Sequence, residues 1–365
     1  MLPTRPTPYP FGAAFARIGI SAALIVACTG LAALTLSTER VPGLRVVTTP
    51  VNVPLGQAKR ATLDVNATGA NLVLNTSGEL GAGDLLTGGV RRRAHSALSV
   101  SAKPDGDTLG ARINLTVPPR APNIVVFGFS SSVQHALRAT LSRAVPTSLT
   151  TTTTWGDQAL NLTQTRLNSL RAQTESGDLA VTLPAARTGD AHVRSSSGDV
   201  SLSAASTPTR TALEVRTNSG DLHATLGGPT DATLTTASGD LTVGARADTR
   251  GTLKAQTGSG DLNVRIAGRA RTTFSTSSGD LSVNVQPGTR GTLAARTGSG
   301  SLTVTVPAGT RLRITARTRL GDLNLPRGLV ARGDTYTTPG GNADLTLTLD
   351  AGIGDIEVRT TGGAQ

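Results

Sequence analysis

A Ser-Gly-Asp tripeptide recurs along this 365-residue chain at a nearly constant interval, and this regularity constrains the fold more than any other feature. The copies and their variants are Trp155-Gly156-Asp157, Ser176-Gly177-Asp178, Ser197-Gly198-Asp199, Ser219-Gly220-Asp221, Ser238-Gly239-Asp240, Ser259-Gly260-Asp261, Ser278-Gly279-Asp280, Ser299-Gly300-Ser301 and Leu320-Gly321-Asp322. Their successive glycines lie 19–22 residues apart. A fixed period of about 20 residues marks a repeat architecture, in which each unit buries its apolar face against its neighbours.

Each repeat has the pattern of two strands joined by the tight turn. In a representative unit, Leu253 and Ala255 alternate with polar residues before the turn, and Leu262 and Val264 do so after it. A period of two places each set of side chains on one face of a strand. We therefore predict an all-β fold, a β-solenoid of two-strand repeats with parallel ladders between coils, over residues 146–360.

The size of one coil is left open by the sequence. The pentapeptide Thr249-Arg250-Gly251-Thr252-Leu253 recurs 40 residues later as Thr289-Arg290-Gly291-Thr292-Leu293, with a different unit between the two. This recurrence fits two alternating coil types of about 20 residues each, or one coil of about 40 residues that contains two half-turns.

The regions that flank the array follow the pattern less closely. Residues 61–145 are β-rich but irregular, and within them residues 132–144 fit either a short helix or another degenerate coil. Residues 344–358 follow an insertion, and we expect them to cap the array because terminal repeats are often atypical. Trp155, at the first coil, is expected to fill the cap of the array, and residues 361–365 are expected to form a tail.

An uncharged apolar run of 19 residues, from Ile18 to Leu36, precedes the repeats. This length is just sufficient to cross the hydrocarbon core of a bilayer. Residues 1–17 carry two arginines, so the positive-inside rule predicts that this end lies in the cytoplasm and the rest outside it. We therefore expect a single-pass protein of the cell membrane whose bulk is extracytoplasmic, in the periplasm or at the cell surface.

Two other interpretations of residues 18–38 remain open. The segment fits an ordinary cleaved signal peptide, and it also fits a lipoprotein signal in which Cys28 would be acylated after cleavage. In each case one N-terminal transmembrane or signal helix precedes the solenoid. Residues 39–60 predict an extended linker, because three prolines disfavour both a helix and a central strand.

The aspartates of the repeated turn are the first candidate site. They are Asp157, Asp178, Asp199, Asp221, Asp240, Asp261, Asp280 and Asp322. Carboxylates stacked about 4.8 Å apart repel by roughly 0.8 kcal/mol per pair in water, and a row of calcium ions would relieve this repulsion. We favour a structural role, in which glycine supplies the positive φ and each carboxylate accepts hydrogen bonds from the N–H groups of its own turn. Calcium-binding β-rolls use a nine-residue repeat, which this chain lacks.

A second row, of arginines, follows the same spacing. It comprises Arg210, Arg250, Arg271, Arg290 and Arg311 and continues to Arg332, with Asp231 interrupting it. The five arginines of the candidate stripe precede the adjacent turn by about half a repeat, so we expect them at the opposite corner of each coil. They form either a solvated edge that blunts aggregation, or a basic stripe that binds a polyanion such as a wall polymer or lipid phosphates.

Composition and motifs argue against catalysis and nucleic-acid binding. Residues 151–365 carry 21 basic and 18 acidic side chains, so the array is close to neutral, and aromatic residues make up 2% of the chain. No hydrolase, zinc-protease or P-loop motif is present. The single cysteine excludes an intrachain disulfide and a cysteine-based zinc site. We expect no catalytic residue, no metal and no cofactor, with a polysaccharide hydrolase or lyase on a β-helix as a remote alternative.

The Ser-Gly-Asp-Leu-x-Val turns behind one N-terminal apolar segment resemble the bacterial putative-adhesin family of toastrack-type β-solenoid domains. The ending, residues 352–358, is similar to the ends of related envelope-stress and cell-wall-antibiotic-response proteins. The resemblance covers residues 146–360 well and 61–130 weakly, and it implies an envelope location and no enzymatic activity.

The function that we expect on this basis is a non-enzymatic, membrane-anchored extracytoplasmic binding or scaffold module. Its expected partners are the membrane, through residues 18–36, and an anionic envelope polymer or an envelope membrane protein, but no nucleic acid. The alternative is an accessory or sensor protein of an envelope-stress response.

Overall fold

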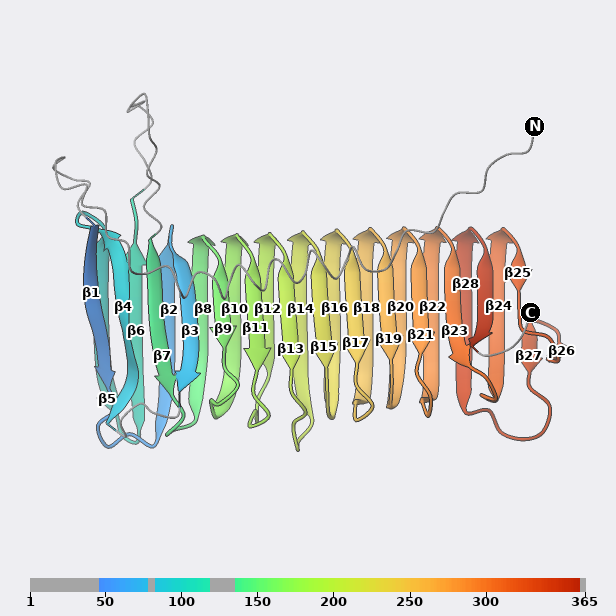
Figure 1. Ribbon diagram of the computed structural model, residues 1–365, viewed down its shortest axis with the longest axis horizontal. Helices are drawn as coiled ribbons and strands as arrows, with labels where there is room; N and C mark the ends of the chain where they lie inside the picture. The colour runs from blue at the N-terminus through green and yellow to red at the C-terminus, as the bar shows by residue number, and fades with distance from the viewer. Residues whose placement is uncertain (1–45, 78–82, 119–134, 362–365) are drawn as a thin grey trace, which may run out of the picture. The chain divides into compact units, whose positions relative to one another are not determined.

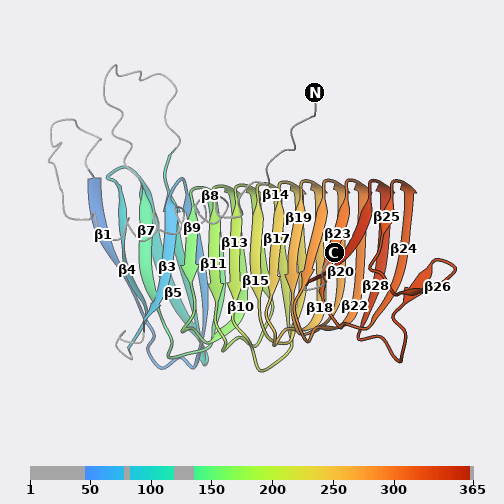
Figure 2. The same ribbon diagram turned by 45° about the vertical axis from the view of Figure 1, so that its right-hand side comes forward.

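The computed structural model describes residues 46–77, 83–118 and 135–361, all of which fall in one compact unit, Val46–Gln365. Regular structure in these residues consists of β-strands in two sheets of 14 and 15 strands (Figures 1 and 2). The prediction of an all-β solenoid with parallel ladders is thus confirmed for the repeats. The described residues include no helix long and apolar enough to cross a membrane, and the expected segment 18–38, with Cys28, lies outside them.

Each coil of the array contributes one long strand to the 15-stranded sheet and one short strand to the 14-stranded sheet. The long strands are β8 (Thr147–Trp155), β10 (Leu167–Ser176), β12 (Ala191–Ser197), β14 (Thr211–Ser219), β16 (Thr230–Ser238), β18 (Arg250–Ser259), β20 (Arg269–Ser278) and β22 (Arg290–Ser299). The short strands are β9 (Gln158–Asn161), β11 (Leu179–Leu183), β13 (Val200–Ala204), β15 (Leu222–Leu226), β17 (Leu241–Ala245), β19 (Leu262–Ile266), β21 (Leu281–Val285) and β23 (Leu302–Pro307). Consecutive strands of each set pair in parallel, so one coil spans about 20 residues and the 40-residue coil is excluded.

Two coil types alternate because the return loops between the short and the long strands alternate in length. Residues 246–249 and 286–289 form four-residue loops, whereas residues 227–229 and 267–268 form loops of three and two residues. The Ser-Gly-Asp turn keeps a constant length in every coil. The alternation of 19- and 21-residue spacings therefore arises entirely at the corner opposite the Ser-Gly-Asp turn.

The core is a narrow layer of aliphatic side chains and threonines between the two sheets. Leu, Val, Ile and Ala occupy the inward positions of both sheets and are almost fully buried. Phe274 is the large exception in the long strands, and its neighbours in register are Ala255 on β18 and Ala295 on β22. The two alanines leave the volume that the buried ring fills, so a large residue is balanced by small ones on the adjacent coils.

At both ends of the unit, the order of strands in space differs from their order in the chain. The strands before the array are β1 (Val46–Pro54), β2 (Arg60–Thr68), β3 (Asn71–Ser77), β4 (Asp84–Arg93), β5 (Ala97–Asp105), β6 (Thr108–Thr116) and β7 (Ala136–Ser142). Strand β2 lies between β6 and β8, and β3 lies between β7 and β9. The first coil in the chain is therefore the second in space.

The C-terminal end repeats this arrangement. The strands after the array are β24 (Leu312–Leu320), β25 (Leu323–Asn324), β26 (Val330–Arg332), β27 (Thr335–Thr337), β28 (Leu345–Ile353) and β29 (Ile356–Thr361). Strand β28 inserts between β22 and β24, and β29 inserts between β23 and β25. The expectation that residues 344–358 cap the array is wrong, because they form an internal coil.

Antiparallel strands close the two ends instead. Strands β1 and β4 extend one sheet beyond β7, β5 extends the other beyond β6, and the β26–β27 hairpin pairs with β24. Part of the expected linker 39–60 is thus strand β1, whose prolines Pro50 and Pro54 are tolerated because β1 is an edge strand. Residues 136–142 form β7 and no helix. Trp155 is 56% exposed at the end of β8, which lies between β2 and β10, so it does not fill a cap.

Candidate functional site

At the Ser-Gly-Asp corner, each aspartate bonds to the next coil. The backbone N–H of Asp261 donates to Oδ1 of Asp240 over 2.8 Å, and the N–H of Asp280 donates to Oδ1 of Asp261 over 2.9 Å. The same bond links consecutive turns from Asp157 to Ser301, at 2.8–3.0 Å. The expectation that each carboxylate serves its own turn is therefore wrong, because the acceptor lies one coil away from its donor.

The glycine of each turn is fixed by the same stacking. Gly260 has φ of +134°, and a Cβ atom there would overlap the carbonyl group of Gly239. That carbonyl also accepts a hydrogen bond from the buried hydroxyl of Thr257 over 3.1 Å, and the N–H of Gly239 donates to Ser259. The backbone N–H and C=O groups of the corner are thus hydrogen-bonded between coils. The carboxylates take part in the same bonding, so their role at this corner is structural.

Two positions show that this corner does not need a row of carboxylates. Asn71 takes the place of the aspartate in the coil before β9, and its Oδ1 accepts from the N–H of Asp157 over 3.1 Å. Ser301 takes the place of the aspartate in its coil and has no carboxylate or amide oxygen. The coil nevertheless keeps the same turn, with φ of +133° at Gly300. No group of three or more His, Cys, Asp or Glu side chains suited to a metal occurs in residues 46–77, 83–118 and 135–361.

The opposite corner carries the arginines, and the strand register decides which of them align. Arg250 on β18, Arg269 on β20 and Arg290 on β22 are directly in register. Arg271, which the spacing placed in this row, lies two residues further along β20. Both Arg269 and Arg271 lie 19 or 21 residues from Arg250 and Arg290, so spacing alone could not distinguish them.

The two ends of the predicted stripe are paired with aspartates. Nε and Nη2 of Arg210 lie 2.5 and 2.7 Å from the carboxylate of Asp231, and those of Arg311 each lie 3.0 Å from that of Asp344. The hydrogen bonds from the guanidinium groups hold the pKa of both aspartates below the usual range. Arg290 lies 3.7 Å from Asp344. These arginines are therefore at least partly neutralised.

The middle of the row lacks such partners. Within the described ranges, Arg250, Arg269 and Arg271 have no carboxylate within ion-pair distance. All three are exposed. We call Arg250, Arg269, Arg271 and Arg290, which come from three adjacent strands, the arginine cluster.

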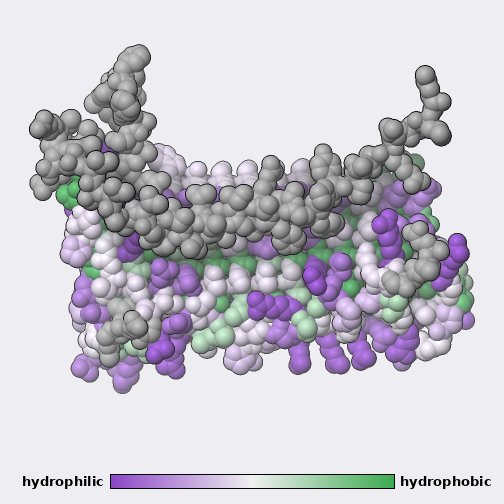
Figure 3. All heavy atoms as spheres, in the orientation of Figure 1, coloured by the Kyte–Doolittle hydropathy of each residue, from purple (hydrophilic) through white to green (hydrophobic). Residues whose placement is uncertain are grey.

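A shallow, open depression of about 610 Å³ lies beside the cluster. Its lining includes Arg269, Arg271, Arg290, Arg311 and Asp344. Gly251 and Gly291, which have no side chain, follow Arg250 and Arg290 in the chain and line the hollow, as do residues 342–344. Hydrophilic residues gather along the lower edge of this face in the C-terminal half (Figure 3). Asp344, the residue before the intercalated strand β28, thus supplies a carboxylate to a lining that is otherwise basic or neutral.

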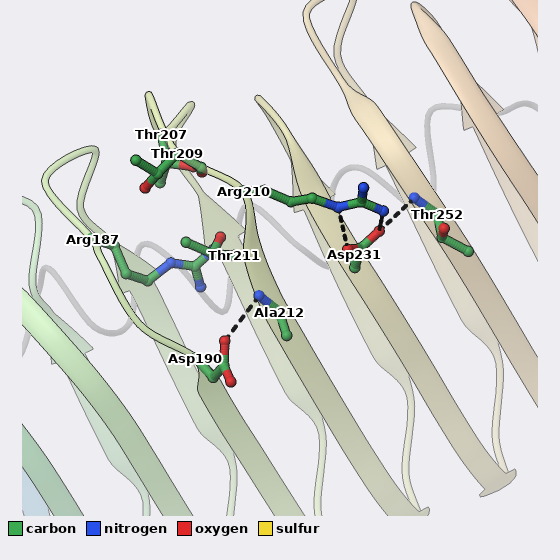
Figure 4. A network of polar contacts seen from close by, with 9 residues as sticks. All are labelled: Arg187, Asp190, Thr207, Thr209, Arg210, Thr211, Ala212, Asp231 and Thr252. Carbon is green, nitrogen blue, oxygen red and sulfur yellow. Dashed lines mark hydrogen bonds and ion pairs between the residues drawn. The ribbon is translucent and has the colours of Figure 1, made fainter.

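Two further arginines, Arg332 and Arg187, do not belong to the exposed row. Arg332 ends β26 in the terminal hairpin and does not continue the row. Arg187 is buried, and its Nη2 donates to the hydroxyl of Thr211 over 2.6 Å (Figure 4). Burial lowers the pKa of Arg187 despite the nearby Asp190, whose Oδ1 accepts from the N–H of Ala212. Arg187 faces the interior and contributes nothing to the exposed row.

Similar solved structures include a "putative cell adhesion protein" from Clostridium sporogenes (11% identity, TM-score 0.30, 87% of this chain and 100% of that chain) and a "putative adhesin" from Bacteroides fragilis (12%, 0.30, 87% and 98%). A "putative lipid binding protein" from Parabacteroides distasonis is also similar (10%, 0.28, 86% and 97%). No curated protein matches the chain. The family described as Toastrack DUF4097 matches residues 48–292, and the chain belongs to this toastrack family, as its Ser-Gly-Asp turns predicted.

Proposed function

We propose that this protein is a non-enzymatic binding module of the cell envelope that holds an anionic polymer on its arginine cluster. The observation that carries the proposal is the uncompensated charge of Arg250, Arg269 and Arg271 beside an open depression. The rest of the molecule is a scaffold that sets the spacing of these side chains.

The chemistry of the cluster suits an anionic ligand. A guanidinium group presents several N–H donors in a planar fork and stays charged at any physiological pH, so it binds phosphate and carboxylate groups with two parallel hydrogen bonds. Like charges on adjacent strands repel, and a bound anion removes that repulsion. The cluster therefore gains more from an anion than an isolated surface arginine does.

The acidic residues support a binding role over a hydrolytic one. The turn aspartates are engaged as acceptors for the backbone of the next coil, and Asp231 and Asp344 are each held by an arginine fork. A general acid needs a raised pKa, whereas the pKa of both Asp231 and Asp344 is lowered. None of these carboxylates is arranged as an acid–base pair.

Attachment to the membrane through residues 18–36 is part of the proposal. The uncharged run of 19 residues and the arginines before it support a retained anchor with the solenoid outside the cytoplasm. Intact-mass and N-terminal analysis of the membrane-extracted protein separates this anchor from a cleaved signal peptide and from acylation at Cys28. A mature chain that begins at Cys28 or later would contradict the retained anchor.

The binding role is tested with full-length protein and isolated envelope polymer, at low and at high salt. The test variant carries Arg250→Gln, Arg269→Gln and Arg271→Gln. The matched control carries Arg171→Gln, Arg194→Gln and Arg216→Gln, which remove the same charge from exposed positions on the same sheet. We expect binding that weakens with salt, is lost in the test variant and is kept in the control. Equal binding by all three proteins would contradict the proposal.

A further inference from the structure

We infer that the arginine cluster takes a chain of phosphate groups three strands long, and that Asp344 ends this site. This inference rests on the proposed function and names the chemical class of its ligand. It follows from the strand register, from the geometry of the two flanking ion pairs and from the intercalation of β28.

The row has a repeat that a linear ligand can follow. Arg250, Arg269 and Arg290 are in register on three adjacent parallel strands, whose backbones lie about 4.8 Å apart. Arg271 lies on the same face of β20, two residues beyond Arg269, so the central strand carries two guanidinium groups. A ligand that runs across the strands meets a cation at every one of these three positions.

The row is bounded on both sides by an arginine that an aspartate already holds. On one side, Pro229 is paired with Arg250, and the arginine beyond it, Arg210, is bound by Asp231. On the other side, the strand next to β22 is β28, which places Asp344 beside Arg290 and against Arg311. An extended anion therefore meets unpaired guanidinium groups on β18 and β20, then Arg290 on β22, which also lies 3.7 Å from Asp344, and a carboxylate at the next position.

Asp344 is fixed in this place by its backbone. Its carbonyl accepts from the N–H of Gly291 over 3.1 Å, and its N–H donates to the carbonyl of Arg311 over 2.9 Å. The side chain accepts two hydrogen bonds from the Arg311 fork, and its exposed fraction is 22%. The backbone bonds fix the position of Asp344, and its carboxylate can turn away from a ligand only by giving up the two hydrogen bonds from Arg311.

The same pair shows why phosphate suits the free positions better than carboxylate. The two oxygens of a carboxylate lie in one plane, and one guanidinium fork engages both of them, as Arg311 does with Asp344, while Arg290 approaches the same carboxylate only to 3.7 Å. A tetrahedral phosphate directs its oxygens to different sides, so it can accept from arginines on two adjacent strands at once. In a chain of linked phosphates, two neighbouring phosphate groups can accept from the same guanidinium group. The chain can therefore contact every arginine of the row.

The test measures affinities of full-length protein for inorganic phosphate, tripolyphosphate, long-chain polyphosphate and citrate, each at low salt. We expect affinity to rise steeply from phosphate to tripolyphosphate, to change little with further length, and to be weak for citrate. Anionic phospholipid vesicles form a further arm that separates a membrane surface from a soluble phosphate chain. Citrate binding as tight as that of tripolyphosphate, or binding to vesicles without binding to either phosphate chain, would overturn the inference.

The role of Asp344 is tested with Asp344→Asn, which keeps an acceptor for Arg311 but removes the charge. The matched control is Asp350→Asn on β28, the strand that Asp344 precedes; the carboxylate of Asp350 lies 3.6 Å from Arg296 and outside the cluster. We expect Asp344→Asn to bind long-chain polyphosphate roughly two- to fivefold more tightly, and Asp350→Asn to bind as the unmodified protein does. Equal affinities of the two variants for long-chain polyphosphate would show that Asp344 does not mark the end of the site.

The outcomes separate this inference from the proposed function. If the isolated envelope polymer binds through the cluster but phosphate chains do not, the proposed function stands and the phosphate class is wrong. If neither binds, both are wrong. If phosphate chains bind equally to the protein with Arg250→Gln, Arg269→Gln and Arg271→Gln, the site has been misplaced.

Discussion

The N–H of Asp280 donates to Oδ1 of Asp261, and this 2.9 Å bond connects two residues that are 19 positions apart in the chain. The equivalent bond recurs from coil to coil, so the carboxylates form a continuous ladder beside the backbone ladder of the sheets. Each aspartate contributes an acceptor, and its negative charge is incidental to that task. The predictions about the scaffold follow from this distinction.

Replacement of Asp261 should show that the oxygen matters and the charge does not. Asp261→Asn keeps Oδ1 and should leave stability nearly unchanged, as Asn71 does naturally for Asp157. Asp261→Ala removes the acceptor for the N–H of Asp280 and should cost about 1 kcal/mol. Urea unfolding of the two variants measures the difference. A larger loss for Asp261→Asn than for Asp261→Ala would show that the carboxylate charge itself is needed.

Gly260→Ala should be among the most damaging single substitutions in the array. The backbone at Gly260 has φ of +134°, and the added methyl group would overlap the carbonyl of Gly239. We expect a loss of about 2–4 kcal/mol, which combines backbone strain with the clash. Gly244→Ala is the control, because its Cβ would approach Thr225 no closer than 3.8 Å. Thermal unfolding should show little change or a small gain there, and equal losses at both glycines would refute the stacking argument.

Phe274 should stabilise three coils at once. Its ring is fully buried between Ala255 and Ala295, and Phe274→Ala would leave a cavity that neither alanine can fill. We expect a loss of about 3–5 kcal/mol for Phe274→Ala, and about 1 kcal/mol for Phe274→Leu. The free energy of urea unfolding is the readout. A loss below 1 kcal/mol for the alanine variant would mean that the coils collapse around the site.

Arg187 should weaken the fold that buries it. Its Nε and Nη1 have no hydrogen-bond partner among the described residues, and burial lowers its pKa. Arg187→Met keeps the length of the side chain without the charge, so we expect a gain of about 1 kcal/mol, despite the lost bond to Thr211. Arg194→Met, at an exposed position, should be neutral. A loss of more than about 1 kcal/mol for Arg187→Met would indicate that the bond to Thr211, or a further internal partner of the guanidinium group, outweighs the cost of burying the charge.

The stability of the fold should rise as pH increases from about 5 to 7. Burial lowers the pKa of His223 below 6.5, so the unfolded chain takes up a proton at a pH where the folded chain does not. The unfolded state therefore binds more protons in this window, and acidification favours it. His223→Gln should flatten the dependence in part, because the pKa of His135 is lowered as well. An unchanged slope in the variant would exclude His223 as a cause.

The sequence was sufficient to predict the repeats because their determinants are local. The alternation around Leu253 and Leu262 requires two strands, and the positive φ at Gly260 requires a tight turn between them. The spacing also predicted an arginine row at the opposite corner. The order of coils at the two ends could not be read in this way, because parallel pairing depends on which strands meet in space. Strands β2 and β28 have ordinary alternating patterns, yet each is inserted between two other coils.

The details of the candidate site depend on the same non-local pairing. Arg269 and Arg271 fit the spacing equally well, and only the register shows that Arg269 aligns with Arg250 and Arg290. Asp344 lies 54 residues beyond Arg290 and reaches it only because β28 is intercalated next to β22. The direction of the aspartate bonds was missed for a related reason, since a contact to the next coil is not visible within one repeat.

The most direct test of the arginine cluster as the binding surface is residue-level protection. Full-length protein is modified with phenylglyoxal, an arginine reagent, in the presence and absence of long-chain polyphosphate, and each arginine is quantified by mass spectrometry. We predict protection of Arg250, Arg269, Arg271 and Arg290, with Arg171, Arg194 and Arg216 modified equally in both samples. Uniform protection of all arginines, or protection confined to residues outside the cluster, would contradict the assignment.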